Sequence, residues 1–183
     1  MHRSTSNAVR IIGGACRGRV IRFPASPALR PTPDRVRETL FNWLGQDLTG
    51  QATLEPYAGS GALSLEALSR GASLAVAVDS DARLVSALRD NGALLRLAGL
   101  EVVRGDALGH LSREPRRFDV IFLDPPFAMD PWDRLLPACA ARLNPGGAVY
   151  AEAGRAILPD AGLSLARQAR AGQVYYHLLR LES

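Results

Sequence analysis

Short apolar segments alternate with longer amphipathic segments through the middle of this 183-residue chain, and this alternation constrains its fold most strongly. The apolar segments have the length of strands and lie at 52–55, 74–78, 101–103, 119–123 and 148–152. The amphipathic segments show helical spacing and lie at 61–69, 81–97 and 131–143. Strands that alternate with helices predict an α/β fold, in which a mostly parallel sheet carries helices on both faces.

The two ends of the chain predict antiparallel hairpins. Residues 163–167 and 173–181 are separated by a glycine-bearing turn, which predicts a C-terminal antiparallel hairpin. Residues 1–33 are rich in Gly, Pro, Ser and Arg, and segments 10–12 and 19–23 predict a small N-terminal β-hairpin. Asp34 then opens a helical pattern as its predicted N-cap, and Gly45 ends it. We expect a basic N-terminal extension, residues 1–33, and one domain, residues 34–183.

Composition excludes several classes of protein. Close to half of the residues are apolar, which is enough for a sizeable core, and no apolar run reaches the roughly 18 residues of a membrane span. The N-terminus leads into no apolar segment typical of a secretory signal. Cys16 and Cys139 lie far apart, and the three histidines are scattered, so we expect free thiols, a cytoplasmic protein and no metal.

Positive charge is concentrated in the first 40 residues. They hold eight arginines and two acids, a balance of +6, although the whole chain carries only +4. Such asymmetry is typical of a surface that binds a polyanion, and a solvated tail is the alternative. We expect the glycines among these arginines (Gly13, Gly14 and Gly18) to let the backbone fit closely against RNA. The arginines predicted to bind RNA are Arg10, Arg17, Arg19, Arg22, Arg30 and Arg35.

A glycine-rich loop follows the first strand of the α/β region and reads Glu-Pro-Tyr-Ala-Gly-Ser-Gly-Ala over residues 55–62. Glycines there let a ligand approach the backbone and leave helix N-terminal N–H groups free. Ser64 stands where the dinucleotide fingerprint requires its third glycine. An acid four residues before Gly59 fits a pocket for S-adenosylmethionine (SAM) better, and a purely structural turn is the alternative.

Two acids follow the next strands of the predicted sheet. Asp79 ends the second strand about 20 residues past the glycines, where an acid can accept hydrogen bonds from ribose hydroxyls. SAM enzymes and NAD enzymes share this feature. Asp81 is better placed to cap a helix. Asp106 follows the third strand and could accept from an adenine amino group, although Gly105-Asp106 is also ordinary turn chemistry.

The motif Asp124-Pro125-Pro126-Phe127 directly follows a buried strand and is the most informative feature. Two prolines make a rigid extended exit from that strand. The Asp124 carboxylate and a backbone carbonyl can therefore converge on one amino group at the sheet edge where ligands bind. Phe127 can stack on a base, a contact worth roughly 1–3 kcal/mol. The motif predicts methyl transfer to an exocyclic amino group of a nucleic-acid base, with Asp124 or water taking the proton.

These motifs resemble those of one family, the bacterial 16S rRNA (guanine-N2)-methyltransferases. The similar segments cover almost the whole chain and lie at 10–14, 17–19, 30–38, 58–61, 65–72 and 124–127. The resemblance implies a Rossmann-like, seven-stranded, mostly parallel sheet and SAM as methyl donor. It also implies a guanine of 16S rRNA within the small ribosomal subunit, or its assembly intermediate, as acceptor. We expect a monomer.

The resemblance also implies residue roles. Asp124, Pro125, Pro126 and Phe127 would hold the guanine. The residues that would line the SAM site are Glu55, Tyr57, Gly59, Gly61, Asp79, Ser80, Asp106 and Ala107. Two positions depart from the family, because Glu55 stands where Asp is usual and Asp79 stands where Glu is usual. Neither exchange removes the charge.

Three alternatives remain open from the sequence. A DNA adenine amino-methyltransferase would use the same Asp-Pro-Pro-Phe motif. A dinucleotide-dependent oxidoreductase is disfavoured by Ser64 and by that motif. A non-catalytic RNA-binding module would explain the arginines but not the acids at the mouth of the sheet.

Overall fold

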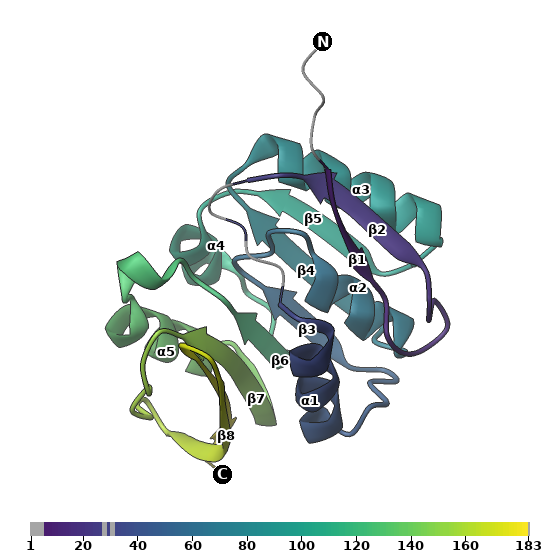
Figure 1. The fold of residues 1–183 in the computed structure, drawn as a ribbon. Helices are drawn as coiled ribbons and strands as arrows, with labels where there is room; N and C mark the ends of the chain where they lie inside the picture. The colour runs from purple at the N-terminus through teal and green to yellow at the C-terminus, as the bar shows by residue number, and fades with distance from the viewer. Residues whose placement is uncertain (1–5, 27–28, 30–31, 183) are drawn as a thin grey trace.

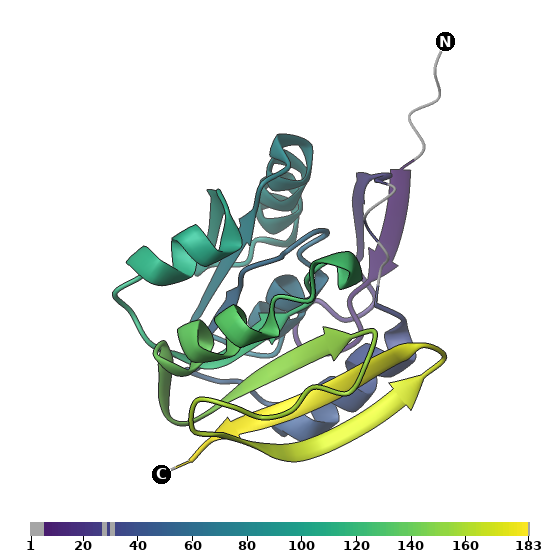
Figure 2. The ribbon, with the colours of Figure 1, turned by 90° about the vertical axis from the view of Figure 1, so that its left-hand side faces the viewer.

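The computed structural model describes residues 6–26, 29 and 32–182 and has an α/β fold with three layers (Figure 1). Its central sheet has seven strands in the order β5-β4-β3-β6-β7-β9-β8. The strands are β3 (Ala52–Glu55), β4 (Leu74–Asp79), β5 (Leu100–Arg104), β6 (Phe118–Leu123), β7 (Leu143–Ala153), β8 (Leu163–Ala171) and β9 (Val174–Leu181). The first five are parallel, and β9 pairs antiparallel with both β7 and β8. Figure 2 shows this closing hairpin extending the sheet. The predicted fold class is confirmed.

Helices cover both faces of the sheet. The described helices are α1 (Asp34–Leu44), α2 (Ala62–Ser69), α3 (Ala82–Leu95), α4 (Ala107–Arg113) and α5 (Trp132–Ala140). Strand β6 shows which helices lie on which face, because its successive residues point to opposite faces of the sheet. Val120 and Phe122 pack in the cluster that contains α1 and α2, whereas Ile121 and Leu123 pack in the cluster that contains α4 and α5. Strands buried on both faces explain the continuous apolar runs of the sequence.

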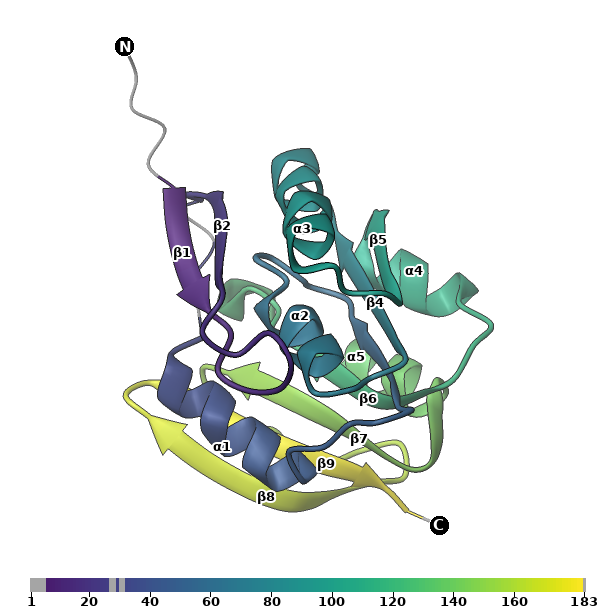
Figure 3. The ribbon, with the colours of Figure 1, turned by 90° about the vertical axis from the view of Figure 1, so that its right-hand side faces the viewer.

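The N-terminal hairpin, β1 (Ser6–Arg10) and β2 (Val20–Pro24), packs beside α3 and α2 (Figure 3). Ile11, Ile21 and Phe23 are buried in the same apolar cluster as Leu65 of α2 and Leu88 of α3. Burial of three large apolar side chains fastens the hairpin to the domain.

A buried carboxylate holds the hairpin loop. Glu66 of α2 is fully buried and accepts hydrogen bonds from the N–H groups of Ile12 and Gly13, at 2.9 and 2.7 Å. It also pairs with Arg37, itself fully buried, and with Arg70. A buried charge requires such partners.

Gly13 and Gly14 have a packing role that the sequence analysis did not predict. A Cβ on Gly14, whose φ is +72°, would lie 1.8 Å from the carbonyl oxygen of Ser69, and a Cβ on Gly13 would lie 2.3 Å from Arg70. These glycines therefore allow close packing against the C-terminal end of α2, and the prediction that they also let the backbone fit against RNA stays a prediction. Among the described residues, a Cβ on Gly18 would meet no atom within 4 Å other than those of its chain neighbours.

Several boundaries differ from the sequence predictions. Pro33, not Asp34, is the N-cap of α1, because Asp34 lies in the first turn and pairs with Arg37. Helix α5 ends at Ala140, and β7 begins at Leu143 and passes through an irregularity before Ala148. Helix α4 was not predicted. None of the helices in the described ranges combines the length and apolarity that a bilayer crossing requires.

Candidate active site

The candidate site lies where the carboxyl ends of the parallel strands meet. Strands β4, β3, β6 and β7 are neighbours in the sheet and point in one direction, so the loops that follow them share one edge. This edge is where open α/β sheets bind ligands. The loop after β3, Asp79 and the Asp-Pro-Pro-Phe motif therefore come together from segments far apart in the chain.

The glycine loop after β3 requires its glycines. Gly59 and Gly61 have φ values of +54° and +72°, and Gly61 caps the N-terminus of α2. A Cβ on Gly61 would lie 2.1 Å from the Leu88 side chain, and one on Gly59 would lie 2.5 Å from Leu29. The loop thus combines left-handed backbone with close packing, and only glycine tolerates both.

Asp79, at the end of β4, holds this loop. Its Oδ2 accepts a hydrogen bond from the Gly59 N–H at 2.8 Å, and its Oδ1 accepts one from the Asp81 N–H at 2.9 Å. Asp81 caps α3, as predicted, by accepting from the Arg83 N–H. Each carboxylate oxygen of Asp79 retains a further lone pair for a ligand hydroxyl.

Glu55, at the end of β3, is buried beside the glycine loop. Its Oε2 accepts hydrogen bonds from the backbone N–H and the hydroxyl of Ser64, at 3.0 and 2.5 Å. Burial raises the pKa of Glu55 to about 8, although the two bonds from Ser64 oppose the shift. The residue at the third fingerprint position therefore holds Glu55. A contact of Glu55 with the SAM amino group stays a prediction.

The other predicted SAM-site residues lie around the same edge. Asp106 caps α4 by accepting from the Gly109 N–H at 2.7 Å, and Ala107 is the buried first residue of that helix. Ser80 is exposed directly after β4, and Tyr57 is half-buried in the glycine loop. Asp106 therefore has a structural function, and its contact with adenine stays a prediction.

Asp124 follows β6 and differs from these acids in its bonding. No residue in the described part of the chain donates a hydrogen bond to its carboxylate, although the residue is half-buried. Burial raises the pKa of Asp124 well above its usual range, and the nearby carboxyls of Glu152 and Glu55 raise it further. A half-buried carboxylate that accepts no hydrogen bond from a described residue is suited to a ligand donor.

Glu152 is a site residue that the sequence analysis missed. The register pairs Leu123 with Ala151, so Asp124, directly after β6, lies beside Glu152 of the adjacent strand β7. Glu152 Oε1 accepts hydrogen bonds from the Tyr150 hydroxyl at 2.9 Å and the Thr32 hydroxyl at 3.0 Å. Burial raises its pKa. The available signal was the position of this acid at the end of the apolar segment 148–152, which the sequence predicts as a strand.

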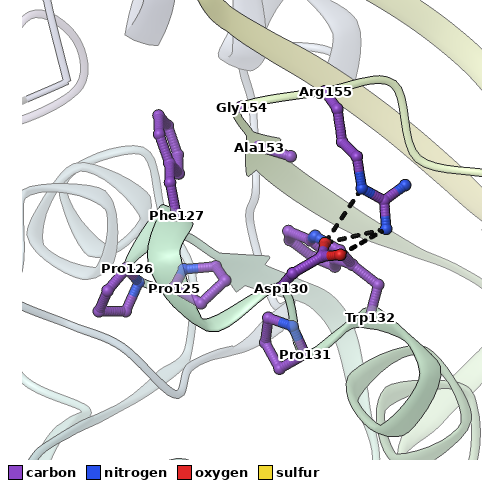
Figure 4. Close-up of a pocket in the computed structure, with 9 residues that line it drawn as sticks. All are labelled: Pro125, Pro126, Phe127, Asp130, Pro131, Trp132, Ala153, Gly154 and Arg155. Carbon is purple, nitrogen blue, oxygen red and sulfur yellow. Dashed lines mark hydrogen bonds and ion pairs between the residues drawn. The ribbon is translucent and has the colours of Figure 1, made fainter.

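A pocket of about 300 Å³ adjoins the Asp-Pro-Pro-Phe loop (Figure 4). Asp124 itself does not line it. Phe127, the first residue of a short 3-10 helix (Phe127–Met129), is 45% exposed and contributes to its wall. The lining residues are Pro125, Pro126, Phe127, Asp130, Pro131, Trp132, Ala153, Gly154 and Arg155.

The predicted RNA-binding arginines are exposed wherever the structure describes them. Arg10, Arg17, Arg19, Arg22 and Arg35 all lie on the surface. None of the five forms an ion pair with a described residue. Arg30 lies outside the described residues. Within the described ranges, no group of three or more His, Cys, Asp or Glu side chains is placed to hold a metal ion.

Solved structures place this fold in a class. The structure of a putative methyltransferase from Escherichia coli, yhhF, matches with a TM-score of 0.88 and 36% identity, over 96% of this chain and 99% of that one. SMU.776, a putative methyltransferase complexed with S-adenosylhomocysteine (SAH), matches in fold alone, with a TM-score of 0.70 and 15% identity over 89% of this chain and 54% of that one. The protein is a methyltransferase with the Rossmann-like fold.

Sequence comparison then gives the family. The family described as Conserved hypothetical protein 95 matches residues 9–180. Ribosomal RNA small subunit methyltransferase D of Escherichia coli (strain K12) is 40% identical over 192 aligned positions, which cover 100% of this chain and 94% of that protein. The chain belongs to the family of ribosomal RNA small subunit methyltransferase D proteins.

Proposed function

We propose that the protein transfers a methyl group from SAM to the exocyclic N2 amino group of a guanine in 16S ribosomal RNA. The observation that carries this proposal is the Asp124 carboxylate, which lies at the ligand-binding edge with no hydrogen-bond donor among the described residues. Its neighbours Glu55 and Glu152 are both occupied by protein donors. Asp124 is therefore the acid available to an amino group.

The residues of the edge fit SAM as the methyl donor. The left-handed glycines bring the backbone close to a ligand, and Asp79 can accept from ribose hydroxyls while it holds Gly59. A protein of the same fold holds SAH. SAM supplies an electrophilic methyl group bonded to a sulfonium sulfur.

The Asp-Pro-Pro-Phe loop supplies alignment. Asp124 and a backbone carbonyl would hold the two amino hydrogens, and the exposed Phe127 ring would stack on the base. The amino nitrogen then forms a bond to the methyl carbon as the carbon–sulfur bond breaks, and the amino group loses one proton to Asp124 or water. Correct positioning of a reactive donor can supply most of such a rate.

The proposal extends to the partner and the place of action. We propose a monomer that acts in the cytoplasm on 16S rRNA within the small ribosomal subunit or its assembly intermediate. The exposed arginines of the N-terminal hairpin support it, because arginine pairs with phosphate and stacks on bases. The printed name of the Escherichia coli relative supports a small-subunit ribosomal RNA substrate.

Transfer of tritiated methyl groups from SAM to undermethylated small subunits tests the proposal. We expect label in N2-methylguanosine after digestion to nucleosides, with less transfer to naked 16S rRNA. Duplex DNA serves as the comparison substrate. Label in N6-methyladenosine, or preferential labelling of DNA, would contradict the proposed acceptor.

A further inference from the structure

The Asp-Pro-Pro-Phe loop leaves the identity of the base unresolved, because adenine and guanine both carry an exocyclic amino group. The pocket beside this loop supplies a second set of contacts. Pro125, Phe127 and Trp132, between the end of β6 and the start of α5, form apolar walls of the pocket. Opposite them lie Ala153, the last residue of β7, and Gly154 and Arg155, which follow it (Figure 4). Its volume of about 300 Å³ lies at the lower end of the range for small-molecule sites, which suits a single base.

One charged pair spans this pocket. The Arg155 guanidinium reaches both oxygens of the Asp130 carboxylate, with Nε–Oδ1 and Nη2–Oδ2 distances of 3.1 Å. Both side chains are more than half exposed, so solvent competes with the pair. Asp130 sits at φ +38°, in the left-handed region that non-glycine residues rarely adopt. The carboxylate thus presents two neighbouring acceptors to an arginine fork inside the pocket.

Guanine presents the same arrangement of acceptors on one edge. Its O6 and N7 atoms match the two-pronged arginine fork, and this pairing is the commonest base-specific arginine contact. Adenine carries an amino donor in place of O6, so an arginine there would face a donor. The N2 amino group lies on a different edge of guanine, so a second protein group can hold O6 and N7 while Asp124 holds N2.

We propose that Arg155 exchanges Asp130 for the O6 and N7 atoms of the target guanine and determines the choice of guanine over adenine. This inference rests on the proposed function. In the free protein, Asp130 holds the guanidinium in its two-pronged orientation. The base displaces the carboxylate when it enters against Phe127.

Steady-state methyl transfer to small subunits tests the exchange with three variants. We expect Arg155→Ala to lower kcat/KM by roughly 10- to 100-fold with unchanged SAM affinity, because a two-pronged base contact is lost. Arg155→Lys should have a kcat/KM close to that of Arg155→Ala, since an ammonium group cannot form the two-pronged contact of a guanidinium. Asp130→Asn removes the competing charge and lowers KM by up to about five-fold. Arg167→Ala, which removes one exposed arginine from the edge strand β8, is the charge-matched control.

The opposite signs of the two substitutions distinguish exchange from a structural ion pair. If Asp130→Asn impairs transfer as much as Arg155→Ala, the pair only braces the loop and the inference is wrong. Arg155 could instead bind a phosphate. In that case Arg155→Ala would lower the slope of log affinity against log salt by the amount of about one phosphate contact, or Arg155→Lys would have full activity. Either result would show that the inference is wrong. Failure of the wild-type protein to label guanosine would instead overturn the proposed function.

Discussion

Asp79 and Gly59 are joined by a hydrogen bond of 2.8 Å between the Asp79 carboxylate and the Gly59 N–H. The bond links the end of β4 to the glycine loop after β3, so the acid expected at the ribose also fixes the loop around the donor. Because Gly59 needs its left-handed backbone, the loop has few other conformations in which it could meet a ligand. Asp79 therefore contributes to SAM binding in two ways.

Asp79→Ala should weaken SAM binding by roughly 1.5–3 kcal/mol, the contribution of a hydrogen bond to a charged acceptor. Isothermal titration calorimetry with SAM and SAH measures this loss. Asp79→Asn is the matched control, because its amide oxygen can still accept from Gly59, and it should lose less. Equal SAM affinity in wild type and Asp79→Ala would show that the ribose is held elsewhere.

Asp124→Ala should abolish methyl transfer while SAM binding survives, because Asp124, unlike Glu55, Asp79, Asp106 and Glu152 of the site, accepts no hydrogen bond from a described residue. Asp124→Asn should retain part of the activity, since its amide oxygen can accept one amino hydrogen. Single-turnover transfer at saturating SAM and small subunits measures both variants. Wild-type turnover in Asp124→Ala would remove this residue from the reaction.

Glu55 should make stability depend on pH. Burial raises its pKa to about 8 from an ordinary value of 4.5, so folding favours its protonated form. Its contribution to the free energy of unfolding is complete below pH 4.5 and is lost as the pH rises toward 8. The loss is on the order of a few kcal/mol. Urea unfolding between pH 5 and 9 measures this dependence. The free energy of unfolding should fall less with rising pH in Glu55→Gln than in the wild type. Parallel curves for the two proteins would contradict this prediction.

Glu66→Ala should lower the free energy of unfolding by roughly 3–5 kcal/mol, because Arg37 would keep a buried charge without its fully buried partner. The N–H groups of Ile12 and Gly13 would also lose their acceptor. Urea unfolding measures the change. Glu38→Ala, on the exposed side of α1, is the control and should change stability by less than about 0.5 kcal/mol. A loss no larger than that of the control would mean that the apolar cluster alone holds the hairpin.

The sequence predicted the elements whose signals are local. Strands β4 and β6 are short runs of apolar residues because both of their faces are buried. Gly45 ends α1 in the left-handed conformation, which glycine adopts more easily than other residues. Helix α4 escaped prediction because it has seven residues, of which only Ala107 and Leu111 are buried, so its apolar pattern is too short to recognise.

Contacts between distant segments account for what the sequence could not predict in the site. Thr32 and Glu152 are 120 residues apart and meet only in the fold. Ser64 excluded the dinucleotide fingerprint, but nothing local indicated that it would hold Glu55. The ends of adjacent parallel strands decide these neighbours, and strand order is a property of the tertiary fold.

Neutralising Arg17, Arg19 and Arg22 together should weaken binding to small ribosomal subunits and flatten its salt dependence. All three are exposed on the N-terminal hairpin and form no ion pair with a described acid, so they remain available to phosphate. Each phosphate contact contributes roughly 0.7–0.9 to the slope of log affinity against log salt concentration. The magnitude of this slope should therefore be about two to three smaller for the triple alanine variant than for the wild type. The fold should survive, because the buried side chains of the hairpin are apolar.

Arg167, Arg170 and Arg180 provide the matched control. They are equally exposed but lie on β8 and β9, at the opposite edge of the sheet from β5, which neighbours α3 and the hairpin. Their triple alanine variant carries the same change in net charge, so any loss specific to the hairpin cannot be a general electrostatic effect. Binding across a salt series, with SAM affinity measured in parallel, compares the two variants. Identical slopes and affinities in both triple variants would assign the hairpin a structural role and move the RNA surface to the region around Phe127 and Trp132.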